Sequence, residues 1–365
     1  MASPVAFPIG AEERTSAAAE RYQDAILPGV SRTFALTIPQ LPPPLYPAVA
    51  NGYLLCRIAD TIEDEEGLEP ALKRQFHDRF IRVVEGEAAA DPFAAELVPL
   101  LTGSTLEAER ELVAHTAIVV SLTHAFSPVQ RAALCHCIQV MCRGMEIYEE
   151  GGPAGLADVA ELGRYCYYVA GCVGEMLTTL FCDYSPELGR HQERLATLAL
   201  SFGQGLQMTN ILKDVWDDRR RGACWLPRDL FARHGVELAD LAGDLDGGVD
   251  RAAFAAGIEE LVGIALAHLR NAVTYVTLIP ARERGLRNFC LWAIGMALLT
   301  LRKIHRNPGF SRGAQVKITH RSVKATILTS RVAGGSNAAL RALFALLVRG
   351  LGPIPDILPA APAVT

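Results

Sequence analysis

Apolar residues recur at intervals of three and four along most of the chain, a period typical of amphipathic and buried helices. Strictly alternating patterns are rare and short. Clusters of Gly and Pro, as in IPQLPPPLYP and HRNPGFSRG, separate the helical stretches and indicate where helices end. Pro47 is placed to open the helix that follows PPPLYP. The pattern predicts an all-α fold. Its longest helical stretches, of 18–27 residues, are 71–88, 129–150, 194–220 and 257–278.

Half of the 365 residues are hydrophobic, so the chain can bury a large core. No Gly/Ser-rich or charged linker divides it, and we predict one domain spanning residues 1–365. The formal charge is −5, and we interpret the two signs as mixed along the chain. Because nucleic-acid binding needs a basic face, we expect no nucleic-acid partner.

The nine cysteines lie mostly in apolar runs such as YCYYVAGCVG. An odd number, in a chain whose first residues show no export signal, predicts reduced thiols that serve as small core residues. CHCIQVMC also suggests a metal site, but Cys135 and Cys137 point to different faces of a helix, which favours the core. No uninterrupted apolar run reaches the roughly 18–20 residues of a spanning helix. We therefore expect a cytoplasmic protein that is soluble or peripheral on a membrane.

Two aspartate pairs stand out: Asp60 with Asp64 in DTIED, and Asp214 with Asp218 in KDVWDD. Residues four apart share one helix face, about 5–6 Å apart at Cβ, where like charges repel each other. A solvated face is the common explanation. However, the preceding segments NGYLLCRIA and GLQMTNIL are typical of buried helices, and buried carboxylates need positive compensation. We infer a cavity in which the carboxylates bind Mg²⁺, which in turn holds a diphosphate.

Further polar residues follow the same helix faces. Asn210 lies one turn before Asp214, so its side-chain oxygen can join the metal ligands, and Gln207 extends the stripe as a candidate diphosphate contact. Basic side chains are expected to hold the leaving phosphates. The candidates are Arg32, Arg57 and Lys213.

Four segments resemble the squalene/phytoene synthase family, the head-to-head prenyl synthases. They are SRTFALTI, YLLCRIADTIEDE, YCYYVAGCVGEM and QMTNILKDVWDDRRRGACWLP, and they span residues 31 to about 227. Two aspartate motifs in this order, with YVAGxVG between them, are a specific signal. The resemblance implies the isoprenoid synthase fold, a single helical bundle with the acidic faces opposed across a central cavity. It also implies the Mg²⁺-dependent joining of two farnesyl diphosphates to presqualene diphosphate, a cyclopropyl compound.

The resemblance assigns roles to aromatic residues. Tyr168 matches the family tyrosine in YxxVAG, which is proposed to carry the proton lost on ring closure. Phe289 matches a family phenylalanine associated with the second reaction step. Aromatic faces can stabilise a carbocation, although every candidate ring except Tyr168 is also explained as a core residue. The remaining aromatic candidates are Phe34, Tyr53 and Tyr165.

The C-terminal third resembles squalene synthases in RNFCLWAIGMALLTLRKIH and GAQVKITHRSV. Squalene synthases ionise presqualene diphosphate and reduce it with NADPH. Lys317 matches a basic residue implicated in holding the cofactor phosphate, and Asn210 is a second cofactor candidate. An ordinary surface lysine explains Lys317 equally well. The positions that depart from the family pattern are Ala293, Ile294, Thr319 and His320.

These departures leave alternatives open. A dehydrosqualene or phytoene synthase would use no reductant, and a non-catalytic scaffold would need none of the aspartates. Residues 339–365 are a candidate for peripheral membrane contact, because Arg341, Arg349 and several prolines exclude a spanning helix. A C30 hydrocarbon product would leave readily into a bilayer. We favour a monomer.

Overall fold

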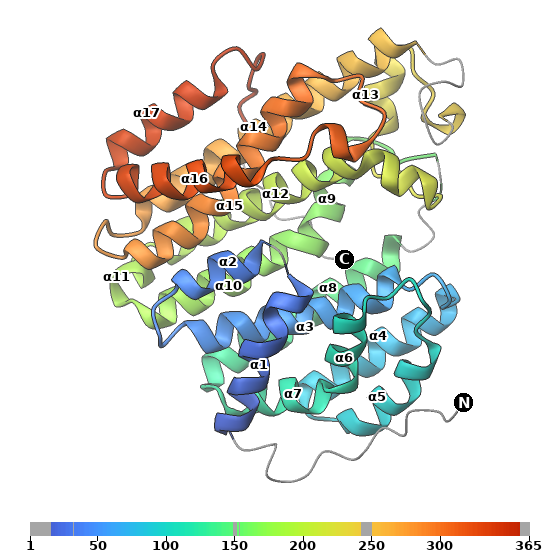
Figure 1. Ribbon diagram of the computed structural model, residues 1–365, viewed down its shortest axis with the longest axis vertical. Helices are drawn as coiled ribbons and strands as arrows, with labels where there is room; N and C mark the ends of the chain where they lie inside the picture. Colours follow the sequence, from blue (N-terminus) through green and yellow to red (C-terminus); the bar gives the residue numbers. More distant parts are fainter. Residues whose placement is uncertain (1–15, 32, 149–151, 153, 242–249, 358–365) are drawn as a thin grey trace. The chain divides into compact units, whose positions relative to one another are not determined.

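The computed structural model describes residues 16–31, 33–148, 152, 154–241 and 250–357 (Figure 1). These residues form α-helices, short 3-10 turns and one π-helix, and no strand is found among them. The predicted all-α class is confirmed. The contacts gather in two compact units, and each is described by itself. Unit 1 comprises Met1–Glu149 and Thr179–Pro186, and unit 2 comprises Glu150–Thr178 and Glu187–Thr365. The prediction of a single domain stays a prediction.

Unit 1 is organised around α3 (Tyr46–Asp64), which packs against α1, α4, α6, α7 and α8. Twelve of its residues are buried, mostly small and aliphatic ones. Pro47 lies in its first turn, as predicted, where a missing backbone N–H costs nothing. The other helices are α1 (Ser16–Val30), α2 (Phe34–Thr37), η2 (Ile38–Gln40), α4 (Pro70–Glu85), α5 (Ala90–Leu97), η3 (Val98–Leu100), α6 (Glu107–Ala114), α7 (Thr116–Ala125) and α8 (Pro128–Tyr148).

Unit 2 is organised around three long helices, α12 (Gln192–Arg220), α14 (Arg251–Leu278) and α15 (Arg284–Arg306), which pack on one another (Figure 1). The chain passes from unit 2 to unit 1 within α10 (Cys172–Tyr184). The other helices are α9 (Val159–Cys166), the π-helix η4 (Tyr167–Gly171), α11 (Pro186–Gly189), α13 (Arg228–Arg233), η5 (Leu238–Asp240), η6 (Gly313–Gln315), α16 (His320–Ala333) and α17 (Asn337–Val348).

The four long helical stretches predicted from the apolar period correspond to α4, α8, α12 and α14. None of the nine cysteines is part of a disulfide, and only Cys135 and Cys182 are more than marginally exposed. Within the described ranges, no three His, Cys, Asp or Glu side chains form a group that could hold a metal ion. In CHCIQVMC, Cys137 and Cys142 are buried as core residues, whereas Cys135 is half-buried.

Helix α14 is the one described helix that is long and apolar enough to cross a membrane, with a mean hydropathy of 1.5 over its 18-residue window. In the folded chain 67% of that window is buried, and α14 packs against α12, α15 and α17. The central helix of a folded core has the same length and composition.

Helix α12 and the η4–α10 segment approach each other closely through glycine. A Cβ atom on Gly203 would lie 2.3 Å from the Ala170 carbonyl oxygen, and one on Gly174 would lie 2.5 Å from that of Ala199. Both obstacles are backbone atoms, which a side-chain rotation cannot relieve. Gly174 thus allows α12 to approach closely. This contact fixes η4, which carries Tyr168, against the helix that carries Asp214.

Replacing Gly203 by alanine should therefore destabilise unit 2. We expect G203A to lower the free energy of unfolding by about 1–3 kcal/mol through overpacking. Gly163 in α9 is the matched control, because a Cβ atom there would meet nothing closer than 3.7 Å. G163A should stabilise the helix by up to about 1 kcal/mol. Urea denaturation measures both, and equal effects would contradict the close approach.

Candidate functional site

The first acidic pair lies at the carboxyl end of α3, in a small network of charges in unit 1. The nearer Arg57 nitrogen lies 3.6 Å from a carboxylate oxygen of Asp60 and 3.6 Å from one of Glu109 on α6. Burial raises the pKa of Asp60 to about 6; Arg57 opposes this shift, while Asp64 and Glu109 add to it. Asp64 is exposed, as the last residue of α3. Asp60 and Glu109 thus share one arginine.

Two aromatic candidates belong to the same network. The Tyr53 hydroxyl donates to the Val30 carbonyl at 2.9 Å and accepts from Arg57 at 3.2 Å. The Phe34 ring lies 5.2 Å from the Tyr53 ring, and both side chains are half-buried. The structure therefore brings Phe34, Tyr53, Arg57 and Asp60 together. Glu109 completes this network, and no sequence pattern singled it out.

Glu65 anchors the end of α3 that carries the first pair. It follows Asp64 directly and is 1% exposed, although the run of acids EDEEG suggests a solvated segment. Its carboxylate accepts four hydrogen bonds of 2.6–2.9 Å, from the backbone N–H groups of Gly67 and Thr102 and from the hydroxyls of Thr102 and Thr105. These bonds lower the pKa of Glu65 to about 2. The glutamate is thus a positioning residue that sequence analysis missed.

The second acidic pair lies near the carboxyl end of α12 in unit 2. Lys213 lies 3.0 Å from an Asp214 oxygen and donates to the Asn210 side-chain oxygen at 3.3 Å. Asp218 is largely buried and accepts from Arg221 at 2.7 Å. Burial raises the pKa of Asp218; Arg221 opposes this shift, and the neighbouring Asp214 adds to it. The predicted stripe runs from an exposed Asn210 through a one-third-exposed Asp214 to this buried carboxylate.

A C-terminal loop packs onto the second pair. The Trp216 indole N–H donates to the Phe310 carbonyl at 2.6 Å, and both rings are buried. A Cβ atom on Gly313 would lie 3.0 Å from the Lys213 carbonyl oxygen and 3.8 Å from an Asp214 oxygen. The segment GAQVKITH, which the sequence analysis associates only with cofactor binding, therefore begins beside Asp214.

Tyr168 lies in the π-helix η4, in which the Cys172 N–H bonds to the Tyr167 carbonyl five residues earlier. Such bulges occur often at functional sites. The Tyr168 side chain is half-buried, and its ring lies 5.4 Å from that of Tyr167. Tyr167 is buried and donates to Glu175 at 3.1 Å. The two adjacent phenols are thus distinct: Tyr167 is bonded to a carboxylate, and Tyr168 is the more exposed.

The remaining predicted residues are distributed as follows. Arg32 lies outside the described residues. Phe289 is buried within α15, and Tyr165 is buried and stacks on Trp225 at 4.1 Å, so both rings are core residues. Gln207 is half-buried on α12. Lys317 is exposed, and its carbonyl accepts a bond from Lys303.

The donor set of each pair suits a hard cation bound together with a phosphate. Neither unit alone supplies three clustered His, Cys, Asp or Glu ligands among its described residues. Mg²⁺ is commonly held by one or two carboxylates plus substrate phosphates and water, rather than by a cage of protein ligands. Paired carboxylates with raised pKa values, as at Asp60 and Asp218, fit that mode because a cation relieves their repulsion.

The fold resembles solved structures of known synthases. A structure of TcSQS with the ligand E5700 superposes with a TM-score of 0.73 at 23% identity, covering 93% of each chain. A dehydrosqualene synthase superposes with a TM-score of 0.62 at 23% identity, covering 85% of this chain and 94% of that one. The chain thus has the all-helical isoprenoid synthase fold.

The sequence identifies the family within that fold. The family model for squalene/phytoene synthase matches residues 27–322, so the chain belongs to this family. A squalene synthase of Candida albicans is 29% identical over 309 residues, covering 84% of this chain and 66% of the relative. A squalene synthase of Botryococcus braunii is 28% identical over 299 residues, covering 79% of this chain and 58% of the relative. The chain thus spans about two thirds or less of the length of these relatives.

The pKa of Glu65 predicts how stability depends on pH. Because the pKa is about 2 in the folded chain and near 4.5 otherwise, the stabilisation is complete above pH 4.5 and is lost as pH falls toward 2. We expect E65Q to cost about 2–3 kcal/mol at pH 7 and progressively less below pH 4. Denaturation at several pH values measures this. E66Q, at an exposed neighbour, should change little at any pH, and a pH-independent cost of E65Q would contradict the assignment.

Proposed function

We propose that the protein is a squalene synthase that condenses two farnesyl diphosphates to presqualene diphosphate and reduces it with NADPH to squalene. The observation that carries this proposal is the pair of crowded aspartate sites, at the ends of α3 and α12, in a chain of this family. The squalene synthases of Candida albicans and Botryococcus braunii among its relatives support the choice of product.

In this proposal Asp60, Asp64, Asp214 and Asp218, with Asn210, hold Mg²⁺ bound to the substrate diphosphate. The metal would supply Lewis-acid stabilisation of the leaving diphosphate. Arg57 and Lys213, which pair with Asp60 and Asp214 in the ligand-free chain, would turn to the phosphate oxygens once cations neutralise the carboxylates. Gln207 would add a neutral hydrogen bond.

The aromatic residues would act on the hydrocarbon part of the substrate. The half-buried rings of Phe34 and Tyr53 offer π faces to a carbocation. Tyr168, the more exposed phenol of η4, would accept the proton lost on ring closure and release it later. Phe289 is buried in α15, so its role would be to shape the core beside the reacting chains.

The segment that begins at η6 is the candidate NADPH contact. NADPH would supply the hydride for the second step. Lys303 and Lys317 are close together, because the ammonium group of the first bonds the carbonyl of the second. Two lysines without a nearby carboxylate among the described ion pairs suit a phosphate group. Asn210, exposed beside Lys213, would contribute a neutral contact.

A reductant-independent synthase is the second candidate. Thr319 and His320 stand where squalene synthases carry Arg and Lys, and a dehydrosqualene synthase shares the fold. Incubating the protein with farnesyl diphosphate and Mg²⁺, with and without NADPH, separates the two candidates. We expect squalene only when NADPH is present, as measured by gas chromatography with mass spectrometry. A triene formed equally with and without NADPH would overturn the reductive step. In a parallel incubation with geranylgeranyl diphosphate, a C40 product would indicate a phytoene synthase.

The acidic pairs are tested separately by removing one charge from each. We expect D60N and D214N each to lower kcat by on the order of 10²-fold or more, because the diphosphate loses a metal ligand. D183N is the matched control, since Asp183 is exposed and lies outside both motifs. Full turnover in D60N or D214N would favour a scaffold role for that pair, and an equal loss in D183N would point to misfolding.

Location and assembly stay predictions. We propose a monomer in the cytoplasm. Contact of residues 339–365 with a membrane is also a prediction, and residues 358–365 lie outside the described part of the chain.

A further inference from the structure

The charges of the chain are segregated, which corrects the interpretation of the two signs as mixed. Residues 284–355 contain 12 of the 35 Lys and Arg residues and no Asp or Glu. The remainder therefore carries 23 basic and all 40 acidic residues. The acid-free segment comprises α15, α16 and α17, which pack against one another in unit 2 (Figure 1). Unit 2 thus has a basic region in a protein of negative net charge.

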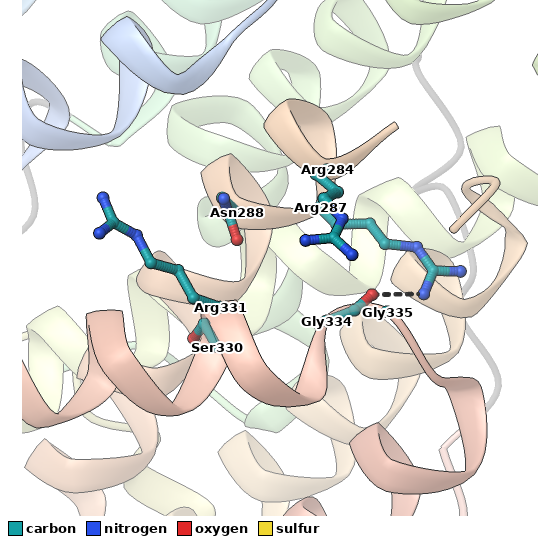
Figure 2. Close-up of a pocket in the computed structure, with 7 residues that line it drawn as sticks. All are labelled: Arg284, Arg287, Asn288, Ser330, Arg331, Gly334 and Gly335. Carbon is teal, nitrogen blue, oxygen red and sulfur yellow. Dashed lines mark hydrogen bonds between the residues drawn. The ribbon is translucent and has the colours of Figure 1, made fainter. Parts of the chain in front are cut away.

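A pocket of about 250 Å³ lies within this segment, between the first turns of α15 and the end of α16 (Figure 2). Two helices supply its polar groups, and Figure 2 shows arginine side chains on both of them. The first turn of α15 also directs its positive dipole end to this place. The lining residues are Arg284, Arg287, Asn288, Ser330, Arg331, Gly334 and Gly335.

Arg287 forms the fixed wall of the pocket. It is 2% exposed, and its guanidinium donates to the carbonyls of Ile279 and Gly334 and to the Asn337 side chain at 2.5–2.9 Å. Figure 2 shows the bond to Gly334. None of these acceptors is charged, and no described carboxylate pairs with Arg287. A buried cation without a counter-ion is costly. An anion in the pocket would compensate it.

Arg284 and Arg331 form the open side of the pocket. Both are exposed, and neither forms an ion pair with any residue that the structure describes. The Arg331 guanidinium lies 6.0 Å from the centre of the Trp292 ring, which holds it above α15. Figure 2 shows the Arg331 guanidinium apart from those of Arg284 and Arg287, so the exposed Arg331 side chain would have to swing toward the other two to share one phosphate, which accepts paired N–H bonds from arginine.

Exposed apolar side chains lie on α16, which lines the pocket, and on α17. Leu328 and Val332, four residues apart on one face of α16, are 66% and 79% exposed and flank Arg331 in the sequence. Leu346 on α17 is 64% exposed. These three account for three of the eight large hydrophobic side chains that are exposed in the described chain. An apolar face bordered by arginine, without acids, is the composition of an interfacial membrane helix.

We propose that α16 and the pocket it shares with α15 form a docking site for an anionic lipid bilayer, with one lipid phosphate held by Arg284, Arg287 and Arg331. Leu328 and Val332 would enter the boundary of the acyl region, and the other basic residues of the segment would lie over the negative surface. The surface formed by α16 and the pocket lies outside residues 339–365, the segment that the sequence analysis names for membrane contact.

The observations favour a membrane over other polyanions. A soluble phosphate compound would account for the arginines but not for the exposed Leu328 and Val332. A nucleic acid would be met by basic and polar side chains along a groove, whereas the exposed face of α16 mixes basic with aliphatic residues.

The test is flotation of the full chain with lipid vesicles in the absence of substrate, so that its outcome does not depend on the proposed reaction. We expect vesicles of phosphatidylcholine with about one third phosphatidylglycerol to bind at least about tenfold more protein than phosphatidylcholine alone. R284E/R331E should lower this binding by about tenfold, and L328D/V332D should also lower it. Far-ultraviolet circular dichroism with thermal melting confirms that each variant is folded.

Two matched double charge reversals serve as controls. R190E/R194E changes two exposed arginines of unit 2 outside the acid-free segment and should alter binding by less than about twofold. R321E/K324E lies on α16 away from the pocket and should cost clearly less than R284E/R331E. Equal loss in R321E/K324E and R284E/R331E would overturn the pocket as the phosphate site.

Three outcomes would overturn the docking site itself. These are equal binding to neutral vesicles, equal loss in R190E/R194E, and release from anionic vesicles by inorganic phosphate or by duplex DNA at constant ionic strength. Release by phosphate would indicate a pocket for soluble phosphate compounds, and release by DNA would indicate a nucleic-acid surface.

Discussion

Negative charge at the carboxyl ends of two buried helices, one in each unit, is the constraint on which each acidic pair depends. The peptide dipoles leave about half a negative charge at such an end, and each acid there is disfavoured by roughly 0.3–1 kcal/mol. Asp64 is the last residue of α3, and Asp218 lies in the last turn of α12. Arg57, Lys213 and Arg221 pair with Asp60, Asp214 and Asp218. Acids concentrated in this way favour the binding of divalent cations, although they lower the stability of the folded chain.

The surrounding chain holds these helix ends by contacts that carry no chemistry themselves. In unit 1 the four hydrogen bonds to Glu65 fix the residue that follows the first pair. In unit 2 Trp216 bonds the loop at Phe310, and Gly203 lets η4 approach α12. Both groups of contacts are buried and largely involve backbone atoms. They tolerate little change in shape, which is what a site that must place metal ligands accurately requires.

The same unit that carries the second acidic pair also carries the acid-free segment. Its cationic residues therefore cannot be neutralised by acids of their own segment, and Arg287 stays buried against neutral acceptors. Such an arrangement costs free energy unless anions occupy it. The η6 segment beside Asp214 and the pocket between α15 and α16 are two separate places where phosphate groups would do so, one for a soluble substrate or cofactor and one for a surface.

The sequence by itself determined the all-α class, the long helices and the two aspartate pairs, because helical period and spacing of four are local properties of the chain. The resemblance of its motifs identified the family for the same reason. Sequence patterns did not show Glu109 beside Arg57, the burial of Glu65, the π-helix under Tyr168 or the loop on Asp214. These features depend on contacts between residues far apart in the chain, and a local pattern carries no information about such partners. Only the tertiary structure decided them, since burial and pairing set the charge balance of each carboxylate.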